Sequence, residues 1–331
     1  MARSIRRSRL YGRCMASAAP RELVVSVIVP VRNGRRDIPE LLAALRAQTF
    51  PRASFEVVIG DDGSTDGSTE AVDDGNWVRV AYGPPRNSYA ARNRAVAASR
   101  APVLAFCDAD CLPEPDWLER GLAALADTDL AAGRIRFVVP EPRTVWTLLD
   151  MDGTKDHERQ VRQGTAETAN LFLRREVFDA VGGFDGSLPE HGDFDFVERC
   201  VAAGSRLTYV AEAVVWHPAR QRARPFLRAL WIYNRWYAAR ASREGLRPDA
   251  AKLRCLVPLV STQRGRRRQG RPLGLDRAWL AANGVEPGRA ESLRALPLIY
   301  VLVPYLRAAA QIRGWWDGRA LRGRAAAPLR R

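Results

Sequence analysis

Strand-like and helix-like segments alternate between residues 23 and 125, and this alternation limits the fold more than any other feature of the chain. A β-rich run at 23–31 is followed by apolar residues at helical spacing from Ile38 to Leu45. The same pattern predicts strands at 55–60, 78–81 and 103–107, a short helix at 68–72, and helices at 89–99 and 114–125. Strands separated by helices in this way predict a parallel α/β sheet.

Two of these predicted strands run directly into carboxylates. The strand at 103–107 precedes Asp108 and Asp110, and the strand at 55–60 precedes Asp61 and Asp62. Ligands of such sheets bind at the carboxyl ends of the strands, where a carboxylate pair can hold a divalent cation and the cation a diphosphate. Either cluster alone would also suit a solvated, capped turn. Two strands that both end in carboxylates are hard to explain by solvation.

Composition adds a charge imbalance to this picture. The chain has 331 residues, 47% of them hydrophobic, and a formal net charge of +15. Of its 52 basic residues only Lys155 and Lys252 are lysines. An excess of arginine suits nucleic acid, an anionic membrane surface or a phosphorylated substrate. The five cysteines show no repeated spacing and the N-terminus has no apolar signal segment, which favours reduced thiols and a cytoplasmic location.

The pattern changes along the chain suggest three parts. Residues 1–22 carry six arginines without apolar periodicity and are predicted to be a basic flexible arm, in which either Met1 or Met15 is the start. Residues 23–218 form the predicted α/β domain. After 131 its alternation weakens, with strands predicted at 170–173, 207–210 and 213–216 and helices at 176–181 and 193–203. Residues 219–331 form a basic, aromatic, helical C-terminal region.

Four motifs resemble those of the family 2 glycosyltransferases in order and spacing. They are Ser26-Val-Ile-Val-Pro-Val-Arg-Asn33, Val57-Val-Ile-Gly-Asp-Asp-Gly-Ser-Thr-Asp66, Ala91-Arg-Asn-Arg94 and Asp108-Ala-Asp110. The resemblance covers roughly residues 23–218. It implies a GT-A fold, which is a Rossmann-like, mostly parallel mixed sheet flanked by helices. It also implies a UDP- or GDP-sugar donor, a divalent metal (Mn²⁺ or Mg²⁺) and inverting transfer to an acceptor hydroxyl.

The resemblance further implies a donor site and a metal site. The donor-binding set would be Pro30, Arg32, Asp61, Asp62, Arg92 and Asp108. Within it, Pro30 and Arg32 would line the nucleoside pocket, and Asp62 would contact the base. Asp61 and Arg92 would shape the same site, while Asp108 would face the ribose and diphosphate. Asp110 would be the direct metal ligand. His217 matches a metal-binding histidine of some relatives, although a lone histidine at a strand end is as often structural.

An inverting displacement needs one carboxylate on the acceptor side to take the hydroxyl proton. The resemblance assigns this role to Asp193 in Gly192-Asp-Phe-Asp195, with Asp195 behind it. Many relatives have a glutamate where this chain has Gly192, so Glu190 is kept as a second candidate for the base. The alternative is that these acids only stabilise a helix N-terminus.

The C-terminal region allows two interpretations. Residues 224–243 combine arginines with Trp231, Tyr233, Trp236 and Tyr237. This helix either docks on the catalytic domain or contacts anionic lipid headgroups. The segment 295–306 is apolar, but it is short and contains two prolines, which favours a core or interfacial element over a membrane span. Docking is the favoured interpretation of this helix. The hypothesis to test for the whole region is a peripheral contact with the inner face of the plasma membrane that brings a glycan or lipid-linked acceptor to Asp193.

Two other functions compete with cell-surface glycan, polysaccharide or glycolipid synthesis. A nucleic-acid-binding protein would explain the basic charge and the aromatic residues, but carboxylates at two strand ends would repel phosphate unless a metal bridged them, so no nucleic acid is expected. A sugar-1-phosphate nucleotidyltransferase would also be metal-dependent. No glycine-rich loop with a lysine follows the first strand, which ranks this alternative lower.

Overall fold

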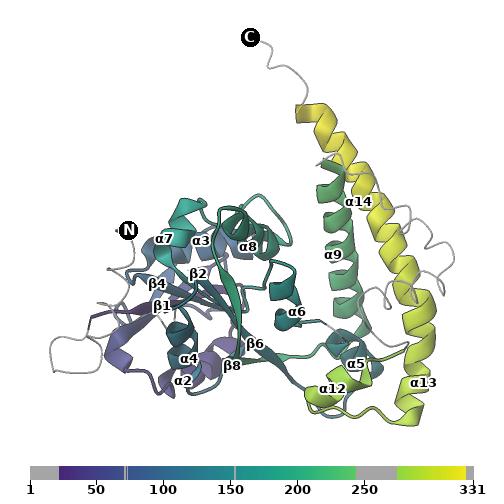
Figure 1. Ribbon diagram of the computed structural model, residues 1–331, viewed down its shortest axis with the longest axis horizontal. Coiled ribbons are helices and arrows are strands. Elements are labelled where there is room, and N and C mark those ends of the chain that lie inside the picture. Colours follow the sequence, from purple (N-terminus) through teal and green to yellow (C-terminus); the bar gives the residue numbers. More distant parts are fainter. Residues whose placement is uncertain (1–21, 71, 73, 153, 244–273, 326–331) are drawn as a thin grey trace. The chain divides into compact units, whose positions relative to one another are not determined.

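The computed structural model describes residues 22–70, 72, 74–152, 154–243 and 274–325, and the chain divides into two compact units (Figure 1). The first unit contains residues up to 136 together with 155–217. The second contains residues 137–154 and those from 218 onward. The predicted arm at 1–22 lies outside the described residues except for Glu22.

One eight-stranded sheet organises the first unit, in the order β3-β2-β1-β4-β7-β6-β8-β5. Its strands are β1 (Val25–Val31), β2 (Phe55–Asp61), β3 (Val78–Ala81), β4 (Val103–Cys107), β5 (Leu112–Pro113), β6 (Leu130–Val138), β7 (Asn170–Arg174) and β8 (Leu207–Pro218). The first four strands of the order pair in parallel, whereas β7 is antiparallel to both β4 and β6, and β5 is antiparallel to β8. The expected α/β sheet is confirmed as a mixed one.

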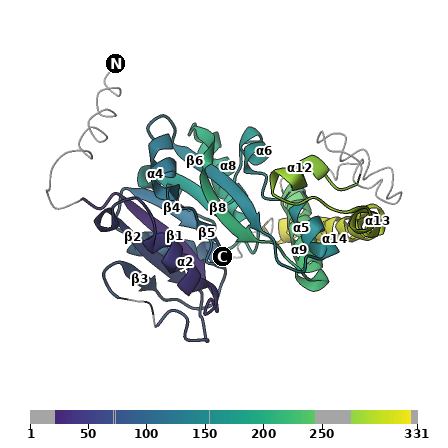
Figure 2. The same cartoon turned by 90° about the horizontal axis from the view of Figure 1, so that it is seen from below.

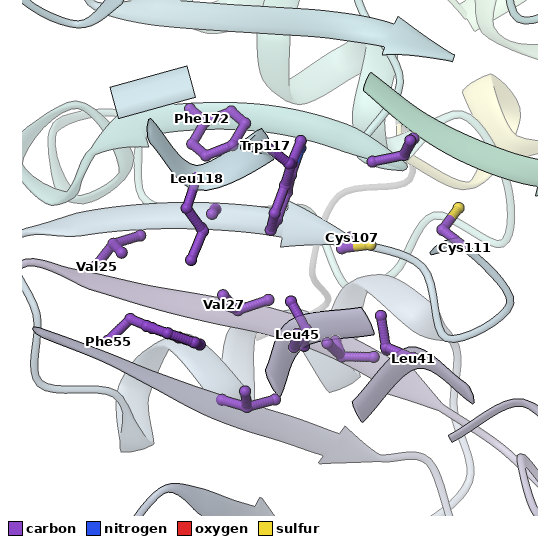
Figure 3. Packing of buried hydrophobic residues seen from close by; sticks show 14 of the residues in the cluster. Val25, Val27, Leu41, Leu45, Phe55, Cys107, Cys111, Trp117, Leu118 and Phe172 are labelled. Atoms are coloured by element: carbon purple, nitrogen blue, oxygen red, sulfur yellow. The ribbon is translucent and has the colours of Figure 1, made fainter. Parts of the chain in front are cut away.

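Helices cover both faces of this sheet (Figures 1 and 2). One face carries α2 (Asp37–Arg46) and α4 (Trp117–Ala124), and the other carries α3 (Ser88–Ala98), α7 (Arg175–Ala180) and α8 (Gly192–Ala202). The central strand β1 supplies both cores, because Val25 and Val27 join the first cluster and Ile28 joins the second. Figure 3 shows the first cluster, in which Leu41 and Leu45 pack against the valines. The short elements η1 (Arg52–Ser54) and α6 (His157–Arg162) complete the unit.

A close approach between β2 and α3 fixes where the 91–94 motif lies. A Cβ atom on Gly60 would come within 2.1 Å of the Ala91 carbonyl oxygen. Only glycine fits here, so the helix sits directly on the strand end. The side chains of residues 92–94 are therefore held next to the loop that follows β2.

Three local predictions need correction. Residues 68–70 and 72 form turns and no helix. The loop is held by side-chain hydrogen bonds, such as the one that the Arg35 N–H donates to the Asp66 carboxylate at 3.1 Å. The two strands predicted at 207–210 and 213–216 are one strand, β8. Strand β6 was not predicted, because its first half is rich in small residues. Gly133 belongs to that half, and a Cβ there would come within 2.4 Å of the Ala213 carbonyl oxygen.

The second unit is mainly helical. Its elements are α5 (Val145–Met151), α9 (Ala223–Arg243), α12 (Arg277–Ala282), α13 (Arg289–Pro297), η3 (Leu298–Leu302) and α14 (Val303–Ala325). Residues 137–154 belong to this unit because Phe137, Leu148 and Met151 join its hydrophobic cluster. Helices α9 and α14 lie side by side (Figure 1). Gly314 on α14 allows this, since a Cβ there would lie 1.8 Å from the Arg235 carbonyl oxygen of α9.

The helical run Arg289–Arg319 is long and apolar enough to cross a membrane by length and composition. An 18-residue window within it has a mean hydropathy of 1.4, and 28% of that window is buried. A single such helix is weak evidence for a span. The segment predicted to be short is thus part of a longer helix. Pro297 does not end it, because the π-helical turn at 298–302 continues the run.

Candidate active site

The carboxyl ends of β1 and β2 bring the predicted nucleoside-side residues together. Pro30 lies opposite Gly60 and Val31 opposite Asp61 in the parallel register. The Asp62 N–H donates to the Val31 carbonyl oxygen at 2.8 Å, which continues the pairing by one residue. Pro30 is half-buried and Arg32, one residue beyond β1, is exposed. The two strand ends therefore form one shared rim.

The carboxylates on this rim are buried and compensated. Both oxygens of Asp61 accept from the Ser64 N–H at 3.2 Å. Asp62 accepts from the Arg86 N–H at 2.8 Å and lies 3.5 Å from the Arg94 guanidinium. Hydrogen bonds from backbone N–H groups hold each carboxylate in a fixed direction and offset the cost of burying it.

Helix α3 connects three parts of the site through consecutive side chains. Arg92 forms an ion pair with Asp108 at 2.5 Å. Asn93 donates to the Phe184 carbonyl oxygen at 2.7 Å and accepts from the Phe184 N–H at 3.0 Å. Arg94 donates to the Asp61 carbonyl oxygen at 2.6 Å. The sequence assigned a role only to Arg92, but its two neighbours anchor the loops on either side of it.

Asp108, Asp110 and His217 form a cluster that could hold a metal ion. One ligand atom from each residue lies within 4.8 Å of the others. His217 reaches the cluster because β5 and β8 pair with Leu112 opposite Trp216, which places the end of β8 beside the loop after β4. The carboxylate oxygens suit either Mn²⁺ or Mg²⁺, and a neutral imidazole nitrogen can join them around Mn²⁺, so the donor set fits the divalent cation implied by the sequence and favours Mn²⁺.

Asp110 is the less compensated carboxylate of this cluster. Burial of its carboxylate and repulsion from Asp108 raise the pKa of Asp110 to about 6. Its side chain is still 41% exposed, and the Nε2 atom of His217 lies 3.9 Å from it. A divalent cation would stabilise the ionised form of such a group.

Asp193 lies in the first turn of α8, as predicted. Burial, and then repulsion from Glu167, raise the pKa of Asp193 to about 6, while Arg92 and Lys155 oppose the rise. Asp195 instead forms an ion pair with Arg199 at 2.8 Å. Asp195 is therefore committed to Arg199, whereas Asp193 accepts a hydrogen bond from the Phe194 N–H at 3.0 Å.

The structure explains why Gly192 stands where many relatives have a glutamate. A Cβ at this position would come within 2.7 Å of the Tyr89 ring, which is buried under the start of α8. Burial raises the pKa of Tyr89, and the negative charges of Asp193 and Glu190 raise it further. Glu190 is half-buried and precedes the helix, so it lies near Tyr89 but outside the first helical turn.

Three residues that the sequence did not single out also belong to the site. The Nζ atom of Lys155 lies 2.5 Å from a Glu167 carboxylate oxygen. His157 holds the same segment, since its Nδ1 pairs with the Gly133 carbonyl oxygen at 2.7 Å and its Nε2 accepts from the Glu167 N–H at 3.0 Å. The available signal was compositional: Lys155 is one of two lysines in an arginine-rich chain.

Comparison with known proteins identifies relatives of the chain. The family model described as glycosyl transferase family 2 matches residues 26–184. The chain is 35% identical to the glycosyltransferase AglE of Haloferax volcanii over 206 residues, covering 59% of this chain and 67% of that protein. It is 32% identical to the succinoglycan biosynthesis protein ExoU of Rhizobium meliloti, covering 58% and 60%.

Solved structures share the fold at lower identity. The mannosyltransferase PcManGT from Pyrobaculum calidifontis, in complex with GDP-Man and Mn²⁺, matches with a TM-score of 0.58 and 20% identity over 95% of this chain and 93% of that one. TarS 1–349 from S. aureus, in complex with UDP, matches with a TM-score of 0.50 and 19% identity over 93% of each chain. These similarities confirm the predicted GT-A fold.

Proposed function

Because the chain belongs to glycosyltransferase family 2, we propose that it transfers a sugar, with inversion, from a UDP- or GDP-sugar to an acceptor hydroxyl in a metal-dependent reaction. The observation that carries this proposal is the Asp108–Asp110–His217 cluster. It lies at the end of β4, a strand that pairs directly with β1. Structural neighbours of the chain bind GDP-Man with Mn²⁺ and UDP.

The donor side is assigned to the rim of parallel strands. Pro30, Arg32 and Asp61 would line the nucleoside pocket, and Asp62 would accept a hydrogen bond from the base. Asp108, oriented by Arg92, would face the ribose and diphosphate. Asp110 and His217 would hold the divalent cation, which when bound neutralises charge on the departing nucleoside diphosphate.

The acceptor side is assigned to α8. Asp193 would take the proton of the acceptor hydroxyl as the new bond to the anomeric carbon forms and the bond to the diphosphate oxygen breaks. A base with a pKa of about 6 is ionised at neutral pH and still accepts a proton readily. Attack from the face opposite to the leaving group inverts the anomeric centre.

The test of this function is a panel of nucleotide sugars, each assayed with and without Mn²⁺ for hydrolysis and for thermal stabilisation of the full chain. We expect one UDP- or GDP-sugar to be hydrolysed slowly only when metal is present, and to raise the melting temperature more with metal than without it. A single-stranded oligonucleotide serves as the comparator. Binding of the oligonucleotide without any response to nucleotide sugars would favour the nucleic-acid alternative instead.

We further propose that the second unit binds an anionic membrane surface and that the acceptor is a glycan or a lipid-linked sugar. Most of the exposed large hydrophobic residues in the described chain lie on α9, α13, η3 and α14: Tyr233, Tyr237, Leu293, Leu296, Val301, Leu302, Tyr305, Ile312 and Trp316. Arginines of the same helices lie among them, including Arg228, Arg294 and Arg313, all exposed. Aromatic rings, aliphatic side chains and arginines together suit the headgroup region of a bilayer.

This surface makes the enzyme peripheral to the inner face of the membrane, in a pathway such as polysaccharide synthesis, the process named for ExoU. Co-sedimentation with vesicles that contain anionic lipid tests it. Binding should fall with added salt and with the double variant Tyr305→Ser and Trp316→Ser. The variant Tyr82→Ser removes an exposed aromatic residue of the first unit and should leave binding unchanged. Salt-insensitive or absent binding would refute the membrane proposal without touching the transfer reaction.

A further inference from the structure

We infer that Lys155 is a donor-binding residue whose ammonium group contacts the distal phosphate of the nucleotide sugar and stabilises the nucleoside diphosphate as it leaves. This inference rests on the proposed function and adds a second positive group beside the predicted cation site. It concerns a residue outside the four sequence motifs.

The Lys155 side chain is held in place on several sides. It is 14% exposed and pairs with Glu167, which is 16% exposed. Glu167 is fixed in turn by the Gln160 amide, which donates to its second carboxylate oxygen at 2.9 Å, and by His157, which accepts from its backbone N–H. Lys155 itself has a φ of 57°, a left-handed conformation that is uncommon for a residue with a Cβ. Such a strained, well-anchored residue is typical of functional positions.

Cys107, the last residue of β4, pairs with Asn170 of β7, so the segment just before Asn170, which contains Glu167, runs beside Asp108 and Asp110, and the ion pair with Glu167 places the Lys155 ammonium group there too. The ammonium group stabilises the ionised forms of Asp110 and of Asp193, and it interacts with Asp108. Burial alone would lower the pKa of Lys155, but attraction to Glu167 and then Asp108 outweighs burial and raises it. The group therefore stays charged close to the predicted metal ligands.

The charge balance of the site gives this ammonium a purpose. The carboxylates of Asp108, Asp110, Glu167 and Asp193 interact with one another and with the cationic side chains of Lys155 and Arg92. Arg92 is 5% exposed and is already committed to Asp108 at 2.5 Å. A diphosphate that enters this region brings further negative charge, which grows when the sugar departs. Lys155 is also paired, but its partner Glu167 is not among the residues predicted to bind the donor.

The alternative is that Lys155 only neutralises Glu167. The two possibilities differ in what they do to ligands. A structural ion pair affects folding and treats mono- and diphosphates alike, whereas a contact to the distal phosphate distinguishes the two. The comparison of UDP with UMP, and of GDP with GMP, isolates that contact because each pair shares its nucleoside and its first phosphate.

The experiment measures dissociation constants of these four nucleotides by calorimetry with the full chain, in Mn²⁺ and again in EDTA. In the variant Lys155→Gln we expect the diphosphate that the wild-type chain prefers to bind about 10- to 100-fold more weakly, as for loss of one charge-assisted hydrogen bond. The matching monophosphate should bind as before. The weakening should persist in EDTA, because the ammonium acts without the metal.

The matched control is Arg162→Gln on helix α6, which follows Lys155. It removes one positive charge from an exposed ion pair with Glu158, whose side chains are 64% and 57% exposed, and it should change none of the four constants. If Lys155→Gln fails to fold, the double variant Lys155→Gln and Glu167→Gln removes the pair without leaving a buried carboxylate unpaired. It should show the same selective loss of diphosphate affinity.

Equal weakening of di- and monophosphate, or no change in either, would overturn the inference while leaving the proposed function in place. If the wild-type chain binds neither UDP nor GDP in Mn²⁺, the proposed function and this inference fail together. A selective loss in Lys155→Gln supports both.

Discussion

The carboxylates of the catalytic unit form two groups that differ in how their charge is compensated. On the donor side, Asp61, Asp62 and Asp108 each have a close partner, either backbone N–H groups or Arg92. Asp110 and Asp193 each have a pKa raised to about 6, Asp110 by burial and its neighbour Asp108, and Asp193 by burial and Glu167. Asp61, Asp62, Asp108 and Asp110 lie at strand ends on one edge of the sheet, and Asp193 lies on helix α8.

We propose that this difference separates residues that position a ligand from residues that take part in the chemistry. A buried charge is costly unless it is paired. A paired carboxylate is therefore a rigid acceptor, suited to holding a base or a ribose. A carboxylate whose charge is less fully compensated retains a stronger tendency to bind a cation or a proton, which is the tendency that a metal ligand and a general base need. The predictions below test this division.

The largest effect is expected for Asp110→Asn. The substitution keeps the shape of the side chain but removes its charge, so the cation loses its direct ligand and transfer should fall by about a thousandfold or more. The wild-type chain should gain thermal stability from Mn²⁺, and the variant should not. The control Asp116→Asn changes an exposed acid of the α4 cap that pairs with Arg120. An unchanged Mn²⁺ response in Asp110→Asn would show that the metal binds elsewhere.

The next effect is expected for Asp193→Asn, which should lower kcat by about 10²- to 10⁴-fold and leave the dissociation constant of the donor unchanged. In the wild-type enzyme, kcat should fall as the pH drops below about 6, because protonated Asp193 cannot accept the hydroxyl proton. Asp195→Asn serves as the comparison, since it breaks the Arg199 ion pair and should reduce stability more than kcat. Near wild-type turnover in Asp193→Asn would exclude it as the base and direct attention to Glu190.

The sequence predicted the strand ends better than the loops between them. The ends of β1, β2 and β4 could be predicted because these strands are local, strongly apolar segments whose following residues must meet at one edge. Lys155 and Glu167 were missed, since their pairing depends on a loop whose path no periodicity encodes. The absence of glutamate at position 192 could not be explained from sequence, because the reason is the distant ring of Tyr89.

A smaller effect is expected for Arg92→Met, which tests the compensated group. Without the guanidinium, Asp108 keeps its charge but loses its orientation, so KM for the donor should rise by about tenfold or somewhat more, with a lesser change in kcat. The comparison variant is Arg120→Met. The Arg120 side chain is 55% exposed and pairs with Asp116, away from the site. If kcat fell instead and KM stayed constant, Arg92 would belong with the chemical group and the division would be wrong.

The smallest effect concerns stability. The pKa of Asp193 is raised from an ordinary value of 3.8 to about 6 in the folded chain. The folded state therefore holds a proton that the unfolded state has released between these values, and this stabilisation is lost as the pH rises through about 6. Asparagine cannot ionise, so Asp193→Asn should raise the melting temperature at about pH 8 by roughly 2–4 °C and have little effect near pH 4. The size is modest because Asp193 is only half-buried and water screens part of its charge.

Asp195→Asn should instead lower the melting temperature at pH 8, because it removes a favourable ion pair. Equal shifts for Asp193→Asn at both pH values would mean that its carboxylate is compensated like those on the donor side, and the contrast between the two groups would disappear.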